Sequence, residues 1–275
     1  MIAKSRSIIL SAINNFYTLH KKLIMPAVLK EIKQGVAVVT LNREDKINSI
    51  NREMALLLQQ VFKECELDEN VKAVYLTGSG KSFCAGQDLA EASDINMMQK
   101  ILPEQLNPLV SLIRRLNKPI VAAVKGVAAG AGASLALCCD IVVASSTASF
   151  IQAFSKIGLV PDSGATHILP RLIGWQKAAA FMMLAEKVSG EEAERVGMIY
   201  KVFPDDTFEK EAFSIAVALT QMPAKALALT KDALNRSVTN SFDEQLKAEE
   251  ELQITACRTK EFAERIAAFL QKKKM

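Results

Sequence analysis

The stretch IVAAVKGVAAGAGASLALCCDIVVA, residues 120–144, decides the fold class. Its two ends, Ile120–Val124 and Ile141–Ala144, are short, apolar and rich in β-branched residues, which predicts two buried strands. Between them, the small residues of Ala131–Cys138 predict a helix that packs closely against a strand. Apolar strands separated by a helix indicate an α/β core whose sheets are covered on both faces.

The same pattern appears upstream. Val36–Leu41 (VAVVTL) and Ala73–Thr77 (AVYLT) predict further buried strands. A helix is expected to open near Asn51, and Met97–Leu116 is expected to be mostly helical. The α/β core is therefore predicted to span residues 25–205.

Residues 206–275 contain no further strand pattern and predict a helical region that packs on the core or on a partner subunit. Two helix starts have capping-box spacing, at Ser189 with Glu192 and at Ser241 with Glu244. Pro223 stands where another helix could begin.

Composition narrows the function classes. Half of the 275 residues are hydrophobic. The net charge of +4 is a mild positive excess that favours an anionic ligand. Only 6% of residues are aromatic, which argues against a nucleic-acid binder. Five cysteines without a CxxC motif indicate reduced thiols. Only two histidines are present and neither has ligand spacing, so no metal site is predicted. No apolar run reaches the roughly 18 residues of a membrane span.

Residues 1–24 are interpreted as an N-terminal extension. The first thirty residues lack Asp and Glu but include lysines and an arginine, a bias that also fits a transit peptide. The expected location is the cytoplasm, or an organellar matrix if this segment is a targeting signal.

Three segments carry the chemistry: SFCAGQDL (Ser82–Leu89), KGVAAGAGASLALCCDIV (Lys125–Val142) and KIGLVPDSGAT (Lys156–Thr166). In this order and spacing they resemble the crotonase (enoyl-CoA hydratase/isomerase) superfamily, from about Met25 to the C-terminus. The resemblance implies the ClpP/crotonase-like fold of ββα units in two roughly perpendicular sheets, a C-terminal trimerisation region and homotrimers that often pair into hexamers. It also implies an acyl-CoA substrate, with no cofactor beyond the coenzyme A that the substrate carries.

The resemblance implies that the backbone N–H groups of Ala85 and Ala131 hold the thioester oxygen. Fixed dipoles at this place stabilise the negative charge of an enolate, although tight packing alone would also require small residues. The same matching assigns coenzyme A contacts to three residues of the LNREDKINSIN loop and to four residues of the small-residue segments. These residues are Lys46, Ile47, Asn48, Gln87, Asp88, Leu89 and Gly130. For each of them a solvated loop position is the alternative.

The acidic residues select the reaction. Ser134 and Phe154 stand where the hydratases of this superfamily have two water-activating glutamates, and neither side chain is a general base at neutral pH. Asp162 stands where some isomerases have aspartate, so it is the predicted acid/base, with a pKa raised by burial. An N-cap role in the turn Pro161–Gly164 is the alternative. Phe154, Ser134 and Phe150 are expected to line the acyl pocket, with a plain core position as the alternative for the phenylalanines.

The predicted activity is an acyl-CoA isomerase. GLVPDSG, with Ser and Phe at the glutamate places, looks most like the isomerases of ring 1,2-epoxyphenylacetyl-CoA, with a Δ3,Δ2-enoyl-CoA isomerase as the neighbouring possibility. Two alternatives are an enoyl-CoA hydratase of broad specificity and a catalytically idle scaffold that binds acyl-CoA or RNA.

Overall fold

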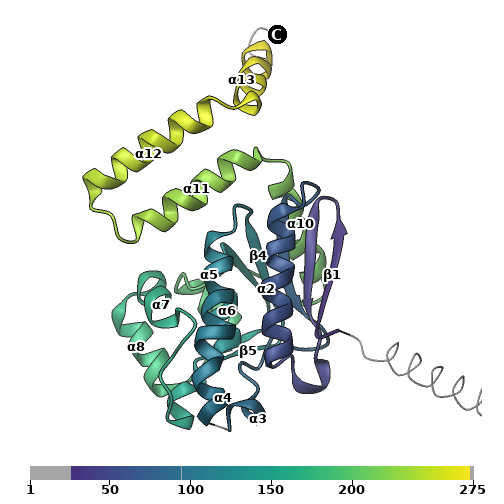
Figure 1. Ribbon diagram of the computed structural model, residues 1–275, viewed down its shortest axis with the longest axis vertical. Coiled ribbons are helices and arrows are strands. Elements are labelled where there is room, and N and C mark those ends of the chain that lie inside the picture. The colour runs from purple at the N-terminus through teal and green to yellow at the C-terminus, as the bar shows by residue number, and fades with distance from the viewer. Residues whose placement is uncertain (1–25, 94, 273–275) are drawn as a thin grey trace, which may run out of the picture.

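The computed structural model describes residues 26–93 and 95–272, and Figure 1 shows the arrangement of their elements. A six-stranded sheet forms the centre, in the order β1-β2-β3-β4-β6-β9. Only β1 runs antiparallel to its neighbour; the other pairs are parallel. The strands are β1 (Val28–Lys33), β2 (Val36–Leu41), β3 (Ala73–Gly78), β4 (Ile120–Val124), β6 (Ile141–Ser145) and β9 (Lys201–Phe203).

A second, three-stranded sheet has the order β5-β7-β8. Its strands are three residues each: β5 (Val127–Ala129), β7 (Ser149–Ile151) and β8 (Lys187–Ser189). An isolated parallel bridge joins Cys84 to Ala128, so the segment after β3 lies along the edge of β5. The α/β prediction and the two sheets are confirmed, but the strands of this short sheet were not predicted individually.

The six-stranded sheet is covered on both faces. On β4, Ile120, Ala122 and Val124 belong to one buried cluster, whereas Val121 and Ala123 belong to another, as the two-residue period of a strand requires. The first cluster includes residues of α2 (Arg52–Leu67), α5 (Asn107–Arg115) and α6 (Ala131–Leu137). The second is completed by α10 (Phe208–Thr220).

The predicted helix at 97–116 contains a π-helical turn. It consists of α4 (Ile95–Lys100), a π-helical segment η2 (Ile101–Leu106) and α5. Pro103 lies inside η2, and Pro108 is the second residue of α5. Because α5 continues directly from η2, Pro108 lacks an N–H that could donate to the preceding turn. The remaining short elements are η1 (Glu44–Lys46), α3 (Leu89–Ala92), η3 (Ala153–Ile157), α7 (Ala165–Ile173), α8 (Trp175–Leu184) and α9 (Gly190–Arg195).

Helix starts follow the sequence signals, with one exception. Asn51 caps α2 by accepting from Met54 N, and Pro223 is the N-cap of α11 (Ala224–Ser237). Ser241 and Glu244 form the predicted capping box of α12 (Phe242–Cys257). The second capping box is wrong in one half: Ser189 accepts from Glu192 N at 3.2 Å, but the Glu192 carboxylate pairs with Arg195 instead.

After β9 the described chain is helical, ending with α13 (Lys260–Lys272). Figure 1 shows α11, α12 and α13 at one end of the molecule, beyond the sheets. In the described residues no single helix meets the length and hydropathy of a membrane span, and the pair α10 and α11, bent by 105°, meets them only when taken together. The trimerisation role of this region and the interpretation of residues 1–24, which lie outside the described residues, stay predictions.

One buried ion pair anchors α11 to the core. Lys231 Nζ lies 2.8 Å from Asp140 Oδ2 and donates to the carbonyl oxygen of Ile113 at 2.8 Å. One turn later, Asn235 Nδ2 donates to Arg114 O at 2.8 Å. These contacts fasten the first of the terminal helices to α5 and to the turn before β6.

Candidate active site

A cavity of about 770 Å³, hereafter the main cavity, brings the three segments singled out by the sequence together. Its walls are formed by residues 85–89, 130–131, 153–154, 156–160 and Asp162, together with Ser49, Met98, Ile101 and Leu102. Ile101 and Leu102 belong to the π-helical segment η2. Segments from opposite halves of the core therefore meet around one space of a size suited to an acyl group.

Glycine allows two backbone segments to approach each other at the floor of the main cavity. Ala129 N donates to Cys84 O at 2.9 Å. Gly86 has φ +98°, and a Cβ there would lie 2.8 Å from Ala129 O and 3.5 Å from Ala131 N. A side chain at position 86 would thus push the 85–87 segment away from the start of α6.

The structure corrects the prediction that Ala85 N–H binds the thioester oxygen. This N–H donates to Ile47 O at 2.9 Å, where Ile47 adopts a left-handed φ of +52°. The bond occupies the donor and ties the 46–49 loop to the cavity wall. Ala85 still lines the main cavity, but its amide is not available to a ligand.

The available amides are those of Gln87 and Ala131. Ile50 N donates to Gly86 O at 2.7 Å, and Asp88 N donates to Ile50 O at 2.8 Å. Because successive N–H groups of an extended segment point to opposite sides, the N–H of Gln87 faces away from Ile50. It has no bond to another group within residues 26–93 and 95–272, and neither has the N–H of Ala131, the first residue of α6.

Asp162 contributes a carboxylate to the same space. Its Oδ1 accepts a hydrogen bond from Ser163 Oγ at 2.8 Å. Burial raises the pKa of Asp162 above its ordinary value, and the Ser163 bond acts in the opposite direction. The N-cap alternative is wrong, because α7 begins after Gly164 and has no side-chain cap.

The other carboxylate of the main cavity is engaged elsewhere. Asp88 Oδ2 lies 2.9 Å from Arg43 Nη2, and Asp88 Oδ1 accepts from Ala90 N at 3.1 Å as the cap of α3. This side chain therefore fixes the 43–49 loop and the start of α3 in place. A direct contact between its carboxylate and the coenzyme A nucleotide, as predicted, would compete with both bonds.

Of the three predicted pocket residues only Phe154 lines the main cavity, where it is buried against Gly130. Two predictions are corrected here. Ser134 is buried in α6 and its Oγ donates to Gly130 O at 3.1 Å. Phe150 is fully buried on β7 as part of the core. Neither of them lines the main cavity.

The loop assigned to coenzyme A divides into exposed and buried parts. Lys46 and Ile47 are exposed at the surface, beside Ser49, which lines the main cavity. Asn48 is fully buried, and its Nδ2 donates to Ser79 O and Ser82 O at 2.9 Å each. The Asn48 side chain thus holds two loops together and is not placed to contact coenzyme A, contrary to the prediction.

Leu89 and Gly130 line the main cavity, as a binding role would require. Sequence reasoning missed Lys156, which contributes a cation to the lining, and it missed Met98 and the two residues of η2. Lys156 stands at the start of the segment KIGLVPDSGAT, six residues before Asp162. That spacing is the one signal that could have drawn attention to it.

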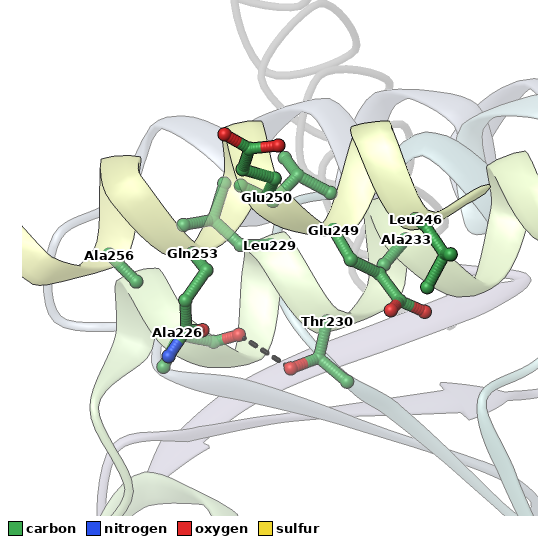
Figure 2. A pocket seen from close by; sticks show the side chains of 10 residues that line it. Ala226, Leu229, Thr230, Ala233, Leu246, Glu249, Glu250, Gln253 and Ala256 are labelled. Atoms are coloured by element: carbon green, nitrogen blue, oxygen red, sulfur yellow. Dashed lines mark hydrogen bonds between the residues drawn. The ribbon is translucent and has the colours of Figure 1, made fainter. Parts of the chain in front are cut away.

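A second cavity, of about 570 Å³, lies between α11 and α12 (Figure 2). Leu229 and Leu246 are among its apolar residues, and Glu249 and Glu250 are its acids. Thr230 Oγ1 donates to Ala226 O at 2.8 Å inside it. None of the predicted site residues lines this space, so the chemistry is assigned to the main cavity.

Comparison with known proteins identifies the family of the chain. Residues 31–275 match the profile of the enoyl-CoA hydratase/isomerase family. The chain is 41% identical to the 1,2-epoxyphenylacetyl-CoA isomerase of Escherichia coli K12, over 91% of this chain and 97% of that protein. It is 34% identical to the short-chain-enoyl-CoA hydratase of Clostridium acetobutylicum, over 90% and 96% of the two chains. The crystal structure of an enoyl-CoA hydratase from Bacillus anthracis has a TM-score of 0.86 at 28% identity, covering 90% of this chain and 96% of that one.

Proposed function

Because this chain belongs to the enoyl-CoA hydratase/isomerase family of the crotonase superfamily, we propose that it is an acyl-CoA isomerase with Asp162 as the acid/base. The thioester oxygen binds between the backbone N–H groups of Gln87 and Ala131. The proposal rests on one observation: the carboxylate whose pKa is raised by burial lines the same cavity as the two amides that lack a partner in the described chain.

The proposed step is a proton transfer within the substrate. Asp162 removes a proton from the carbon beside the thioester carbonyl, and the electron pair moves into a dienolate whose negative charge lies on the thioester oxygen. The two amides stabilise that oxygen, each contributing on the order of 10²–10³ in rate. Asp162 then returns the proton to the far end of the dienolate. No electrons leave the substrate, so the step calls for no redox cofactor.

The raised pKa suits both halves of this cycle. A carboxylate with an ordinary pKa near 3.9 is a weak base and holds no proton to return at neutral pH. Burial moves the pKa of Asp162 toward the working pH, where removal and return of a proton are both efficient. The apolar wall formed by residues such as Phe154 and Leu159 is the source of this desolvation.

Water addition has less support from the side chains. The places where the resemblance puts hydratase glutamates hold Ser134, which is buried and does not line the main cavity, and Phe154, which has no proton to exchange. The remaining carboxylate of the wall, Asp88, is ion-paired with Arg43. Asp162 is therefore left as the acid/base, and one carboxylate is sufficient for a proton shift.

Two substrates fit this chemistry. The E. coli relative is named for 1,2-epoxyphenylacetyl-CoA, which supports the isomerisation of a ring epoxide as the activity of this chain. The proton shift alone moves the double bond of a 3-enoyl-CoA into conjugation through this dienolate. The ring epoxide must in addition break the bond between its two epoxide carbons, which opens the ring to an oxepin without loss of atoms. In both cases the coenzyme A is part of the substrate.

The test is an assay of the purified protein with ring 1,2-epoxyphenylacetyl-CoA, with 3-hexenoyl-CoA and with crotonyl-CoA. The wild-type protein should isomerise at least one of the first two, and Asp162→Asn should lower that rate on the order of 10²–10⁴-fold. Asp206→Asn, a loss of an exposed carboxylate outside the main cavity, should keep it. Fast hydration of crotonyl-CoA that is indifferent to Asp162→Asn would contradict the proposal.

A further inference from the structure

The side-chain amide of Gln87 makes no hydrogen bond in the described chain. Its Nε2 and Oε1 are both shielded from solvent, and neither has a hydrogen-bond partner in the described chain. Burial of an unpaired amide is unfavourable, so such groups are rare in folded proteins and point to a role with a ligand. The residue lines the main cavity.

Two other glutamines, Gln105 and Gln152, are also buried without partners for their amides. Neither of them lines the main cavity. Gln87 differs because an acyl group bound between Asp162 and the backbone amides would lie beside it. Gln87 is therefore distinguished by its place in the lining of the main cavity as well as by its unpaired amide.

The backbone of Gln87 is fixed by hydrogen bonds on both sides, whereas its side-chain amide makes no hydrogen bond within the described chain. The bonds Ile50 N to Gly86 O and Asp88 N to Ile50 O fix the main chain on both sides of it. A change of side-chain rotamer that turns the amide into the main cavity breaks no hydrogen bond of the described chain and leaves the backbone N–H in place. One residue can serve two atoms of the same substrate.

The surroundings define what the amide would bind. The lining is largely apolar: Leu89, Met98, Ile101, Leu102, Phe154, Ile157, Leu159 and Val160. Its other polar side chains are charged or already bonded, as Ser49 is to Arg43. A neutral amide in such a pocket matches an uncharged oxygen, to which it can donate or from which it can accept.

We propose that the side-chain amide of Gln87 hydrogen-bonds an uncharged oxygen on the acyl group, so that the site prefers oxygenated acyl-CoA thioesters to their hydrocarbon counterparts. This rests on the proposed function, in that the main cavity is taken as the acyl site. Because the same residue offers its backbone N–H to the thioester, the recognised oxygen lies only a few atoms from the carbonyl carbon. An epoxide or hydroxyl oxygen on a ring attached beside the thioester meets this condition.

The test uses two thioesters that differ by one oxygen, 2-hydroxyphenylacetyl-CoA and phenylacetyl-CoA, whose dissociation constants are measured by isothermal titration calorimetry. Wild-type protein should bind the hydroxylated thioester about fivefold more tightly. Gln87→Met, which keeps the length of the side chain and the backbone N–H, should abolish this preference. A thermal melt checks that the variant folds, and the wild-type comparison needs no variant at all.

The outcomes separate this inference from the proposed function. Equal affinities in the wild-type protein, or a preference that survives in Gln87→Met, would overturn the role of Gln87 while leaving the isomerase intact. An equal loss of affinity for both thioesters in Gln87→Met would place the amide on the coenzyme A portion and overturn it too. If neither thioester binds the wild-type protein, the acyl-CoA site itself is contradicted.

Discussion

The hydroxyl of Ser163 donates to Oδ1 of Asp162 at 2.8 Å, from a residue that is itself held rigidly. Ser163 is buried, has a left-handed φ of +54°, and its carbonyl oxygen accepts from Cys138 Sγ at 3.3 Å. The bond therefore fixes the orientation of the carboxylate and occupies one of its oxygens. In the proposed reaction, Oδ2 is therefore the oxygen that exchanges a proton with the substrate.

Ser163→Ala should shift the pH dependence of isomerisation. As a base Asp162 works when deprotonated, so kcat/KM rises with pH as the carboxyl loses its proton. The Ser163 bond favours the carboxylate and lowers the pKa of Asp162 against the effect of burial. Removing the bond raises that pKa further, and the acidic limb of the profile should move to higher pH. Ser155→Ala, an exposed serine outside the main cavity, should leave the limb in place. A limb that stays or moves to lower pH in Ser163→Ala would contradict this role.

Asp162→Asn should make the protein more stable at neutral pH. Because the pKa of Asp162 is raised by folding, the folded chain holds this proton more tightly than the unfolded chain. Stability then falls as pH rises from the unfolded pKa, near 3.9, through the folded pKa. Above this pH range the variant should have a higher melting temperature than the wild-type protein. Below it the two melting temperatures should be equal. Melting curves across pH check this, and an equal or lower melting temperature at pH 8 would argue against a desolvated carboxylate.

The strands around α6 could be predicted because their apolar runs are continuous. The runs that became β4 and β6 are buried on both faces, so their composition alone identifies them. The strands β5, β7 and β8 have three residues each and owe their pairing to neighbours far along the chain. Nothing in three residues distinguishes such a strand from a loop.

The candidate site could be predicted as a set of segments but not as a set of atoms. Asp162, Ala131 and Phe154 line one cavity, as their motifs indicated. Which amide of the 85–87 segment is available depends on two contacts, from Ala85 N to Ile47 O and from Asp88 N to Ile50 O. Both contacts join residues more than thirty positions apart, so no local pattern could have moved the assignment from Ala85 to Gln87.

Gly132→Ala should impair both folding and catalysis. A Cβ at this position would lie 2.6 Å from the carbonyl oxygen and from the Sγ of Cys84. The clash should cost about 1–3 kcal/mol of stability and push the start of α6 away from the 84–87 segment. Misplacing the two amides by even 1 Å should lower turnover by about 10²-fold. Chemical denaturation and the isomerase assay measure the two effects, and unchanged values in both would show that the close approach is unimportant.

Lys231→Met should destabilise the protein by about 3–5 kcal/mol, because it leaves the Asp140 carboxylate without its cation. Urea unfolding measures the loss. Lys225→Met, on an exposed position of the same helix, is the matched control and should change stability little. The double variant Asp140→Asn with Lys231→Met should recover part of the loss. If the single and double variants are equally unstable, the ion pair is not the source of the anchor.

We expect the chain to assemble as a trimer or as a pair of trimers through its terminal helices. Phe262, Ile266, Phe269 and Leu270 are spaced to share one face of α13, and each is 41–56% exposed in the single chain. Sedimentation velocity should give the mass of three or six chains. Ile266→Asp should shift the distribution toward single chains, whereas Gln271→Asp at the end of the helix should not. A wild-type protein that sediments as a monomer would refute this expectation.

In the roles proposed for Gln87, the main chain binds the thioester oxygen and the side chain recognises the acyl group. Every residue except proline has a backbone N–H, so almost any substitution at position 87 keeps this donor. The proposed reaction is therefore retained when the side chain changes. The side chain is then free to be exchanged under selection for a different acyl group. A substitution at this single position can therefore change which thioester is accepted without removing the donor that the reaction needs. Related sequences could acquire new substrates in this way.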